Sequence, residues 1–193
     1  MSIQYRSEHD SVGERSVPKD VYYGVQSLRA AENFPITGLA VHPEQINSIA
    51  EIKKASAITN LESGLLDKRV ADAIGRACDE IAAGRLHEAF IVDPIQGGAG
   101  TSLNMNANEV IANRAIELLG GEKGDYALVN PNDHVNYGQS TNDVFPSAGK
   151  LAVLKLLVRA QIQLERLSEA LEAKAEEFDD VLKMGRTQMQ DAV

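Results

Sequence analysis

The sequence of 193 residues has no tryptophan and only one cysteine, Cys78. A single cysteine excludes an intrachain disulfide and fits the reducing cytoplasm. Cys78 occupies an apolar position of an expected helix, so we expect it to be buried and unreactive. No apolar run approaches the ~18 residues of a membrane span. Residues 1–10 lack the apolar core of a secretory signal. We therefore expect a cytoplasmic protein with no membrane partner.

Histidine and positive charge are also scarce. The four histidines form no His/Cys cluster at metal-ligand spacing, which predicts no metal site. The formal net charge is −9, and no basic stripe is visible, which disfavours a nucleic-acid partner. This acidity does not exclude an anionic substrate, because local fields at a site can oppose the net charge.

The apolar spacing predicts a mainly α protein. Residues 1–43 read as irregular with short extended pieces, apart from two helical turns over 25–34. Helices are then expected over 43–63, with Ile46, Ile49 and Ile58 on the buried side, and over 67–83 behind an Asp67 cap. Further helices are expected to begin near Thr101 and near Asp143.

Four asparagines are unusual within the third of these helices. Asparagine is a poor helix former, yet positions 104, 106, 108 and 113 all carry it. One interpretation is that these side chains make buried hydrogen bonds or contact a substrate. The other is that they lie on a solvated face with poor helix propensity. Their pattern alone leaves both interpretations open.

A glycine turn, Gln96–Ser102, precedes that helix and delivers Thr101 to its first turn. A nucleotide-binding loop of the Walker type needs a lysine after the glycines, and none follows here. The dinucleotide pattern needs a preceding strand in a βαβ unit, which is not evident. We therefore expect no nucleotide cofactor at this turn.

The stretch Gln139–Asp143 sets Ser140, Thr141 and Asn142 in a row at an expected helix start. All three residue types are good N-caps, so spare capping is one interpretation. The other is an anion site, because a helix N-terminus offers unpaired N–H groups and partial positive charge.

The helix expected from Asp143 to about Phe178 is long for a chain of this size. At 1.5 Å per residue it spans roughly 50 Å. Its leucines recur by threes and fours, and a lone helix cannot bury such a stripe, so helical partners are implied. This feature by itself equally fits a helical assembly module without catalytic activity.

Four stretches in this order resemble the fumarase/aspartase superfamily: Val21–Phe34, Gly97–Ala115, Asn130–Asp143 and Gly185–Ala192. The resemblance covers nearly the whole chain. It implies a small N-terminal helical domain over 1–138, followed over 139–193 by the start of a long-helix central bundle. It also implies a homotetramer in the full-length protein, no cofactor, and only the N-terminal portion of the complete family chain.

Within the superfamily, the motifs resemble the aspartate ammonia-lyases, which interconvert L-aspartate with fumarate and ammonia. Gln188 stands where class II fumarases have histidine, and Asn130 stands where they usually have histidine before Pro-Asn-Asp. One departure is that Tyr137 and Gly138 replace the family's usual lysine and Ser/Cys. This departure bears on pocket shape and substrate choice.

The resemblance also implies the roles of individual residues. Thr101, Ser140 and Thr141 would hold the substrate β-carboxylate, and Asn142 would meet the amino group. Thr187 and Gln188 would close the other end of the substrate. Arg29 is a weaker candidate for binding the dianion, and a structural ion pair is the alternative for it.

No catalytic residue is expected in this chain. The family's general base is a serine in a Gly-Ser-Ser loop, and the sequence contains no Ser-Ser pair. The chain reaches residue 193 before the place where that loop would lie. His134 has a suitable side chain for a base, but a structural hydrogen bond is the better interpretation. We therefore expect half of a lyase site that cannot turn over alone.

Three alternatives remain open from the sequence. The chain could belong to a class II fumarase, to a non-catalytic relative of the lens-crystallin type, or to a helical assembly module. The polar motifs at 101, 140–142 and 187 have no use in an assembly module. Ammonia-lyases that build an electrophile from Ala-Ser-Gly are excluded, because that tripeptide is absent.

Overall fold

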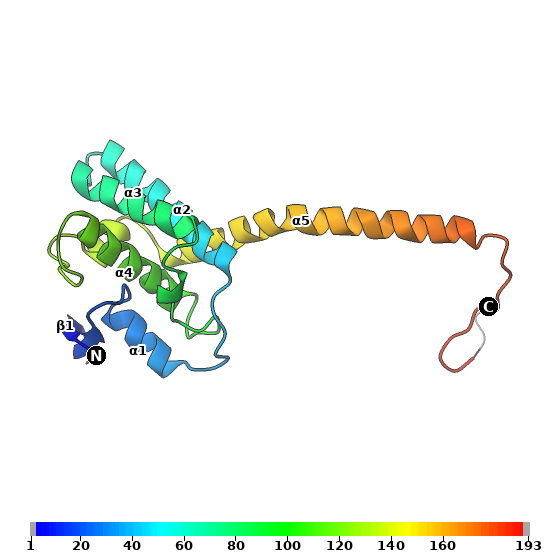
Figure 1. Cartoon of the computed structure of the whole chain (residues 1–193), viewed down its shortest axis with the longest axis horizontal. Helices are drawn as coiled ribbons and strands as arrows, with labels where there is room; N and C mark the ends of the chain where they lie inside the picture. The colour runs from blue at the N-terminus through cyan, green and yellow to red at the C-terminus, as the bar shows by residue number, and fades with distance from the viewer. Residues whose placement is uncertain (1–2, 191–193) are drawn as a thin grey trace. The chain divides into compact units, whose positions relative to one another are not determined.

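The computed structural model describes residues 3–190 and is mainly helical, as expected (Figure 1). A two-stranded sheet is the β structure of the described part. The elements in chain order are β1 (Tyr5–Asp10), β2 (Gly13–Pro18), α1 (Val25–Asn33), α2 (Pro43–Glu62), α3 (Lys68–Ala82), η1 (His87–Ala89), α4 (Thr101–Leu118), η2 (Pro131–Val135) and α5 (Thr141–Glu177).

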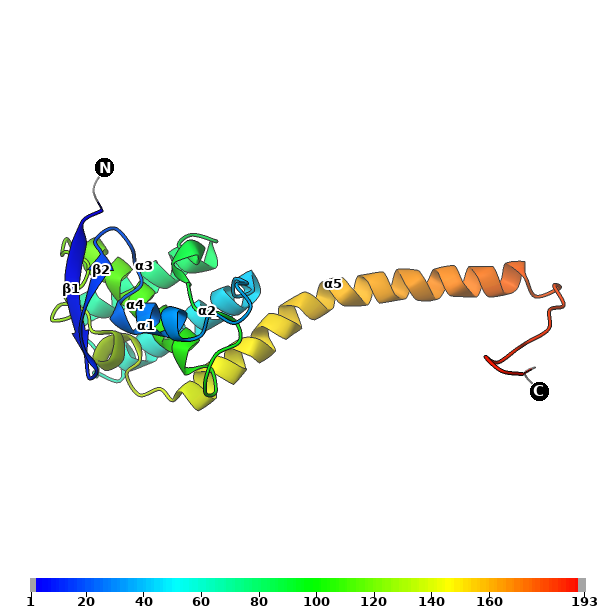
Figure 2. The same ribbon diagram turned by 90° about the horizontal axis from the view of Figure 1, so that it is seen from below.

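The N-terminal segment is more regular than expected. Strands β1 and β2 are the expected extended pieces, but they pair antiparallel as a hairpin, with Tyr5 opposite Pro18 and Asp10 opposite Gly13, which was not predicted. Asp10 Oδ1 accepts hydrogen bonds from the N–H groups of Val12 and Gly13, which closes the turn. Figure 2 shows the hairpin beside α1. The hairpin sequence shows little alternation of apolar and polar residues, because most side chains of the two strands are exposed.

The core lies between α2, α3 and α4. Ile49, Ile74 and Ile111 are fully buried there. Asp67 caps α3 as predicted, accepting from the N–H groups of Arg69 and Val70. The prediction for Ile58 is wrong, because its side chain is 45% exposed. It lies between two core positions of α2, and the core of this chain does not extend around to it.

Cys78 is buried, as predicted. Burial raises the pKa of its thiol to about 12. A thiol that stays protonated is a poor nucleophile.

The asparagines of α4 are buried, so the alternative of a solvated face is wrong. Asn106 accepts from Ile91 N–H and donates to the carbonyl of Ala89. Asn113 donates to the carbonyl of Tyr22. These bonds satisfy backbone groups of loops that cross α4, which explains why polar side chains stand inside a helical core.

Helix α5 begins and ends within two residues of the prediction. Contacts divide the chain into two units, residues 1–153 and 154–193, so the division falls inside α5. Val144, Ala148 and Ala152 of α5 are buried in the first unit. In the second unit Leu164 and Leu171 of α5 are each 62% exposed. The domain boundary placed at 138/139 follows the motif and stays a prediction.

Candidate active site

Thr101 is the first residue of α4, as expected, and its side chain is exposed. The preceding Gly100 has φ +85°, a conformation that L side chains rarely adopt, and it supplies no capping side chain. Gln96 Oε1 from the same turn accepts from Leu103 N–H at 2.8 Å. Gly100 has no side chain that could cap the first N–H groups of α4, so the side-chain hydrogen bond from this turn comes from Gln96.

Ser140 caps α5, which confirms the capping interpretation for this residue. Its Oγ accepts from Asn142 N–H at 3.2 Å, and its carbonyl accepts from Val144 N–H at 3.0 Å. Ser140 and Asn142 are exposed, and Thr141 is half-buried. One cap is enough for the helix, so Thr141 and Asn142 are available for other contacts.

The starts of α4 and α5 lie together in the first unit. A Cβ added to Gly100 would overlap the ring of Phe145, so the glycine turn packs directly on the first turns of α5. A pocket of about 420 Å³ is lined by Gly98, Gly100 and Asn142 together with apolar residues, whereas Ser140 lines a different pocket. The structure therefore brings Asn142 and the turn that carries Thr101 to one place. Two adjacent helix N-termini favour an anion there.

A buried hydrogen-bond network lies beneath these helix starts. Asn104 Nδ2 donates to Thr141 Oγ1 at 3.0 Å and to Asn136 Oδ1 at 3.2 Å. Lys53 Nζ donates to the same Asn136 oxygen at 2.7 Å. The network joins α2, α4 and the loop after η2 to Thr141.

Sequence reasoning missed Lys53, which is fully buried. Burial lowers the pKa of its ammonium to about 7. A signal was present, because Lys53 falls in phase with the apolar stripe of α2 formed by Ile46, Ile49, Ala50 and Ala57. A charged residue in that phase is buried or breaks the stripe.

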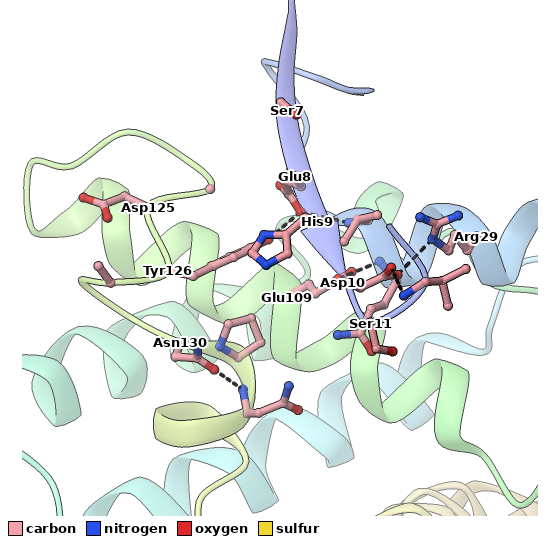
Figure 3. Close-up of a pocket in the computed structure, with 17 residues that line it drawn as sticks. Ser7, Glu8, His9, Asp10, Ser11, Arg29, Glu109, Asp125, Tyr126 and Asn130 are labelled. Carbon is pink, nitrogen blue, oxygen red and sulfur yellow. Dashed lines mark hydrogen bonds and ion pairs between the residues drawn. The ribbon is translucent and has the colours of Figure 1, made fainter. Parts of the chain in front are cut away.

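Arg29 lies apart from these residues. Its Nε donates to Asp10 Oδ2 at 2.9 Å, and its Nη2 donates to the carbonyl of Gly13 at 2.8 Å. Figure 3 shows Arg29 and Asp10 joined by a dashed line at the side of a separate pocket of about 970 Å³. The contacts of Arg29 are those of the structural alternative.

The carboxylates of that larger pocket are engaged within the fold. Glu109 accepts from the backbone N–H groups of Gly24, Gln26 and Ser27, and so caps α1. Glu8 pairs with Arg6 and accepts from Val25 N–H. This pocket is the largest of those described, but its charges hold the hairpin and α1 in place.

Thr187 and Gln188 belong to residues 154–193 and are exposed. Thr187 Oγ1 donates to the carbonyl of Gln190 at 2.7 Å, which closes a local turn. The structure describes these two residues within their own unit alone. Their role at the substrate stays a prediction.

The other candidates of the second motif have local contacts. His134 Nδ1 accepts from Asn130 N–H at 2.9 Å, and Asn130 Oδ1 caps η2. Tyr137 is 40% exposed, and its carbonyl accepts from Asn60 Nδ2. Gly138 has φ +70°, which favours glycine at this position.

Residues 3–190 contain no group of three or more His, Cys, Asp or Glu side chains that could hold a metal ion. Within the same range, no helix combines the length and the apolar character that crossing a membrane requires.

Comparison with known proteins places the chain in a family. A family described as "Lyase" matches residues 13–193. This chain belongs to the fumarase/aspartase family of lyases. Aspartate ammonia-lyase of a Bacillus species is 56% identical over 193 residues, which are all of this chain and 41% of the relative. Class II fumarate hydratase of Halobacterium salinarum is 54% identical, again over 41% of its length.

A solved structure agrees with this assignment. The fumarate lyase:delta crystallin of Brucella melitensis superposes with a TM-score of 0.89 and 52% identity, over 98% of this chain and 45% of that one. The chain thus spans less than half the length of the relatives that it matches.

Proposed function

We propose that this chain supplies the carboxylate-binding half of an aspartate ammonia-lyase site, which eliminates ammonia from L-aspartate to give fumarate. The observation that carries the proposal is the adjacency of the α4 and α5 starts, with Asn142 and the Gly100 turn on one pocket. The 56% identity to a Bacillus aspartate ammonia-lyase supports the substrate.

The chemistry explains why hydroxyl donors beside helix starts suit this role. A base removes a proton from Cβ while the amine leaves from Cα. That proton is a very weak acid, so its removal needs the neighbouring carboxylate to take extra charge as an aci-carboxylate. Preorganised hydrogen-bond donors around that carboxylate stabilise this charge and make the largest single contribution to the rate.

The proposal assigns these donors as the family resemblance does. Thr101, Ser140 and Thr141 hold the β-carboxylate, and Asn142 meets the amino group. Thr187 and Gln188 close the other end of the substrate. Arg29 is left out of the proposed site, because it is already paired with Asp10.

The general base is proposed to come from outside residues 1–193. His134 is a poor candidate, because its Nδ1 is occupied by the N–H of Asn130. We therefore expect no turnover by this chain alone, since binding groups without a base leave the proton in place.

Assembly into a homotetramer belongs to the same proposal. The second unit carries exposed leucines along α5, at positions 154, 157, 164, 167 and 171. Such a stripe is what a helix shared in a bundle buries.

The test is a chimaera in which residues 1–193 replace the matching 41% of the Bacillus aspartate ammonia-lyase. Fumarate absorbance is followed with L-aspartate, with L-malate, and with the 193-residue chain alone. The proposal expects fumarate from aspartate in the chimaera and none from the chain alone. Turnover by the chain alone refutes the half-site.

A fumarase is the second candidate, favoured by the 54% identity to the Halobacterium class II fumarate hydratase. A chimaera bearing the same residues 1–193 in that fumarate hydratase is assayed in parallel. If residues 1–193 support malate dehydration there and fail with aspartate in the Bacillus background, the fumarase assignment replaces the aspartase one. Tyr137 and Gly138 are then the first positions to exchange.

A further inference from the structure

We propose that Lys53 is a positioning residue that sets the direction of the Thr141 hydroxyl through Asn136 and Asn104. The inference rests on the proposed function, in which Thr141 binds the substrate carboxylate. Lys53 lies in the middle of α2 and belongs to no motif of the family resemblance given above.

The network has one consistent polarity, which Lys53 and the Gln139 carbonyl fix together, since Asn136 Nδ2 donates to that carbonyl at 3.3 Å. In its protonated form, Lys53 has three donors and no acceptor. Asn136 therefore turns its oxygen, Oδ1, toward Lys53 Nζ at 2.7 Å. Asn104 approaches the same oxygen and has to present its NH₂ group, at 3.2 Å.

The polarity then passes to Thr141. Asn104 Nδ2 also donates to Thr141 Oγ1, at 3.0 Å. A threonine hydroxyl has one O–H donor and two acceptor positions. Since its oxygen already accepts, its hydrogen is left to donate to a ligand, which is what an oxyanion requires.

The orientation of Asn104 leaves its amide oxygen without a hydrogen bond. Its Oδ1 is buried and has no hydrogen-bond partner in the described part of the chain. Exchanging its amide oxygen and nitrogen would turn that oxygen against Asn136 Oδ1. Lys53, by fixing Asn136, makes the exchanged orientation unfavourable.

A purely structural role does not explain Lys53, because a buried lysine lowers the stability of the fold. It is fully buried, and among residues 3–190 its polar contacts are with Asn136 and Cys78 and with no carboxylate. The titratable group that faces it is Cys78 of α3, a buried thiol. Asn136 and Asn104 on its other side are neutral. An unpaired buried ammonium destabilises a fold, so a methionine at this place would be more favourable for stability.

The experiment compares variants in the Bacillus chimaera with aspartate as substrate. Lys53→Met is expected to lower kcat roughly tenfold or more, with a smaller change in KM. Asn136→Leu is expected to do the same, whereas Asn136→Asp keeps an acceptor for both donors and retains activity. Lys54→Met is the matched control, since Lys54 makes a partly exposed pair with Asp79.

A double-mutant cycle separates positioning from a general structural role. If Lys53 acts through Thr141, adding Lys53→Met to Thr141→Val changes kcat by less than roughly twofold. Thermal unfolding of the 193-residue chain is measured beside it, and Lys53→Met is expected to be no less stable than the unsubstituted chain. Independent, multiplying losses of kcat overturn the inference, as does full activity of Lys53→Met.

A third readout does not depend on the proposed function. Hydrogen exchange of the Asn104 side-chain amide is followed by NMR in the 193-residue chain. We expect slow exchange in the unsubstituted chain and in Asn136→Asp, and fast exchange in Lys53→Met. If the unsubstituted chimaera makes no fumarate, the proposed function fails, and this exchange decides the inference. Unchanged protection in Lys53→Met overturns it, and Asn136→Leu serves where Lys53→Met does not fold.

Discussion

The hydroxyl of Thr141 is held by a side chain from another helix. Thr141 is half-buried at the start of α5, and Asn104 of α4 donates to it. Ser140, its neighbour, caps the helix instead. Adjacent residues of similar chemistry thus accept from different partners, and in each of them the hydroxyl hydrogen is left to donate outward.

Removing that hydroxyl tests its role in the lyase chimaera. Thr141→Val keeps the shape and removes the donor, so kcat with aspartate is expected to fall by ~10²–10³. Thr59→Val is the control, because Thr59 is exposed and its hydroxyl donates to the carbonyl of Ala55 within α2. Equal activities of the two variants would remove Thr141 from the site.

Lys53 gives stability a specific pH dependence. Its pKa is lowered by burial from 10.5 to about 7, so between these values the unfolded chain binds one more proton than the folded one. Stability therefore rises with pH in that window, and the penalty of the buried charge is fully present below it. We expect Lys53→Met to be more stable than the unsubstituted chain near pH 6, with the advantage shrinking by pH 10. Urea unfolding at both pH values measures it, and a constant difference would contradict the expectation.

At the scale of elements, the packing of the glycine turn against α5 joins two halves of the site. Gly100 combines φ +85° with a ring of Phe145 in the place of a side chain. Gly75 in α3 has neither a positive φ nor an atom within 4 Å of an added Cβ.

These two glycines make a matched pair of substitutions. Gly100→Ala is expected to destabilise the chain by at least ~1–2 kcal/mol from backbone strain alone, and to lower kcat in the chimaera. Gly75→Ala is expected to stabilise it by up to ~1 kcal/mol, since alanine is the better helix former. The urea concentration at the midpoint of unfolding is measured for both variants. Equal shifts in the same direction would show that the turn does not pack on α5 as described.

The segment between α1 and α2 depends on one carboxylate, Asp93. Burial by itself raises the pKa of Asp93, but hydrogen bonds from Ile95 N–H, Thr37 N–H, the Thr37 hydroxyl and Gly38 N–H outweigh burial and lower the pKa to about 2. An acid with a lowered folded pKa stabilises above its ordinary pKa, and this contribution is lost as pH falls through the folded value.

We therefore expect Asp93→Asn to loosen the segment around Thr37 at pH 7. The difference from the unsubstituted chain should vanish as pH falls from 4 toward 2. Amide exchange of Thr37 and Gly38 over this range is the measurement. A difference that persists unchanged at pH 2 would assign the anchoring to something other than the charge.

At the scale of the whole molecule, the acidic chain carries an apolar stripe that its own fold leaves exposed in the second unit. Leu164 and Leu171 lie on one side of α5, and Arg159 lies on the other. A helix stripe of this kind is buried by other helices in a bundle.

We expect the stripe to drive self-association. Leu164→Glu with Leu171→Glu should shift the chain toward monomer in sedimentation velocity, since each change places a charge in the buried seam. Arg159→Glu adds a glutamate to the charged side and should leave association unchanged. A chain that is monomeric without any substitution would contradict the expectation.

The sequence by itself determined the helices, the family and the identity of the polar groups at the helix starts. Apolar spacing located α2 to α5, because a helix that packs on one side repeats its apolar residues every three to four positions. The glycine turn and the Ser140–Asn142 row carried their chemistry in the residues themselves. The pattern failed where few side chains are buried, as in the β1–β2 hairpin, and at Ile58, where the extent of the core decides.

Only the tertiary structure decided which groups meet. Asn106 and Asn113 are buried because segments outside α4 need partners for their backbone groups, which spacing within α4 does not show. Arg29 is paired with Asp10 because the hairpin folds beside α1. Lys53 reaches Asn136 across 83 positions of sequence, and a contact between residues so far apart depends on the packing of α2, α4 and η2 together.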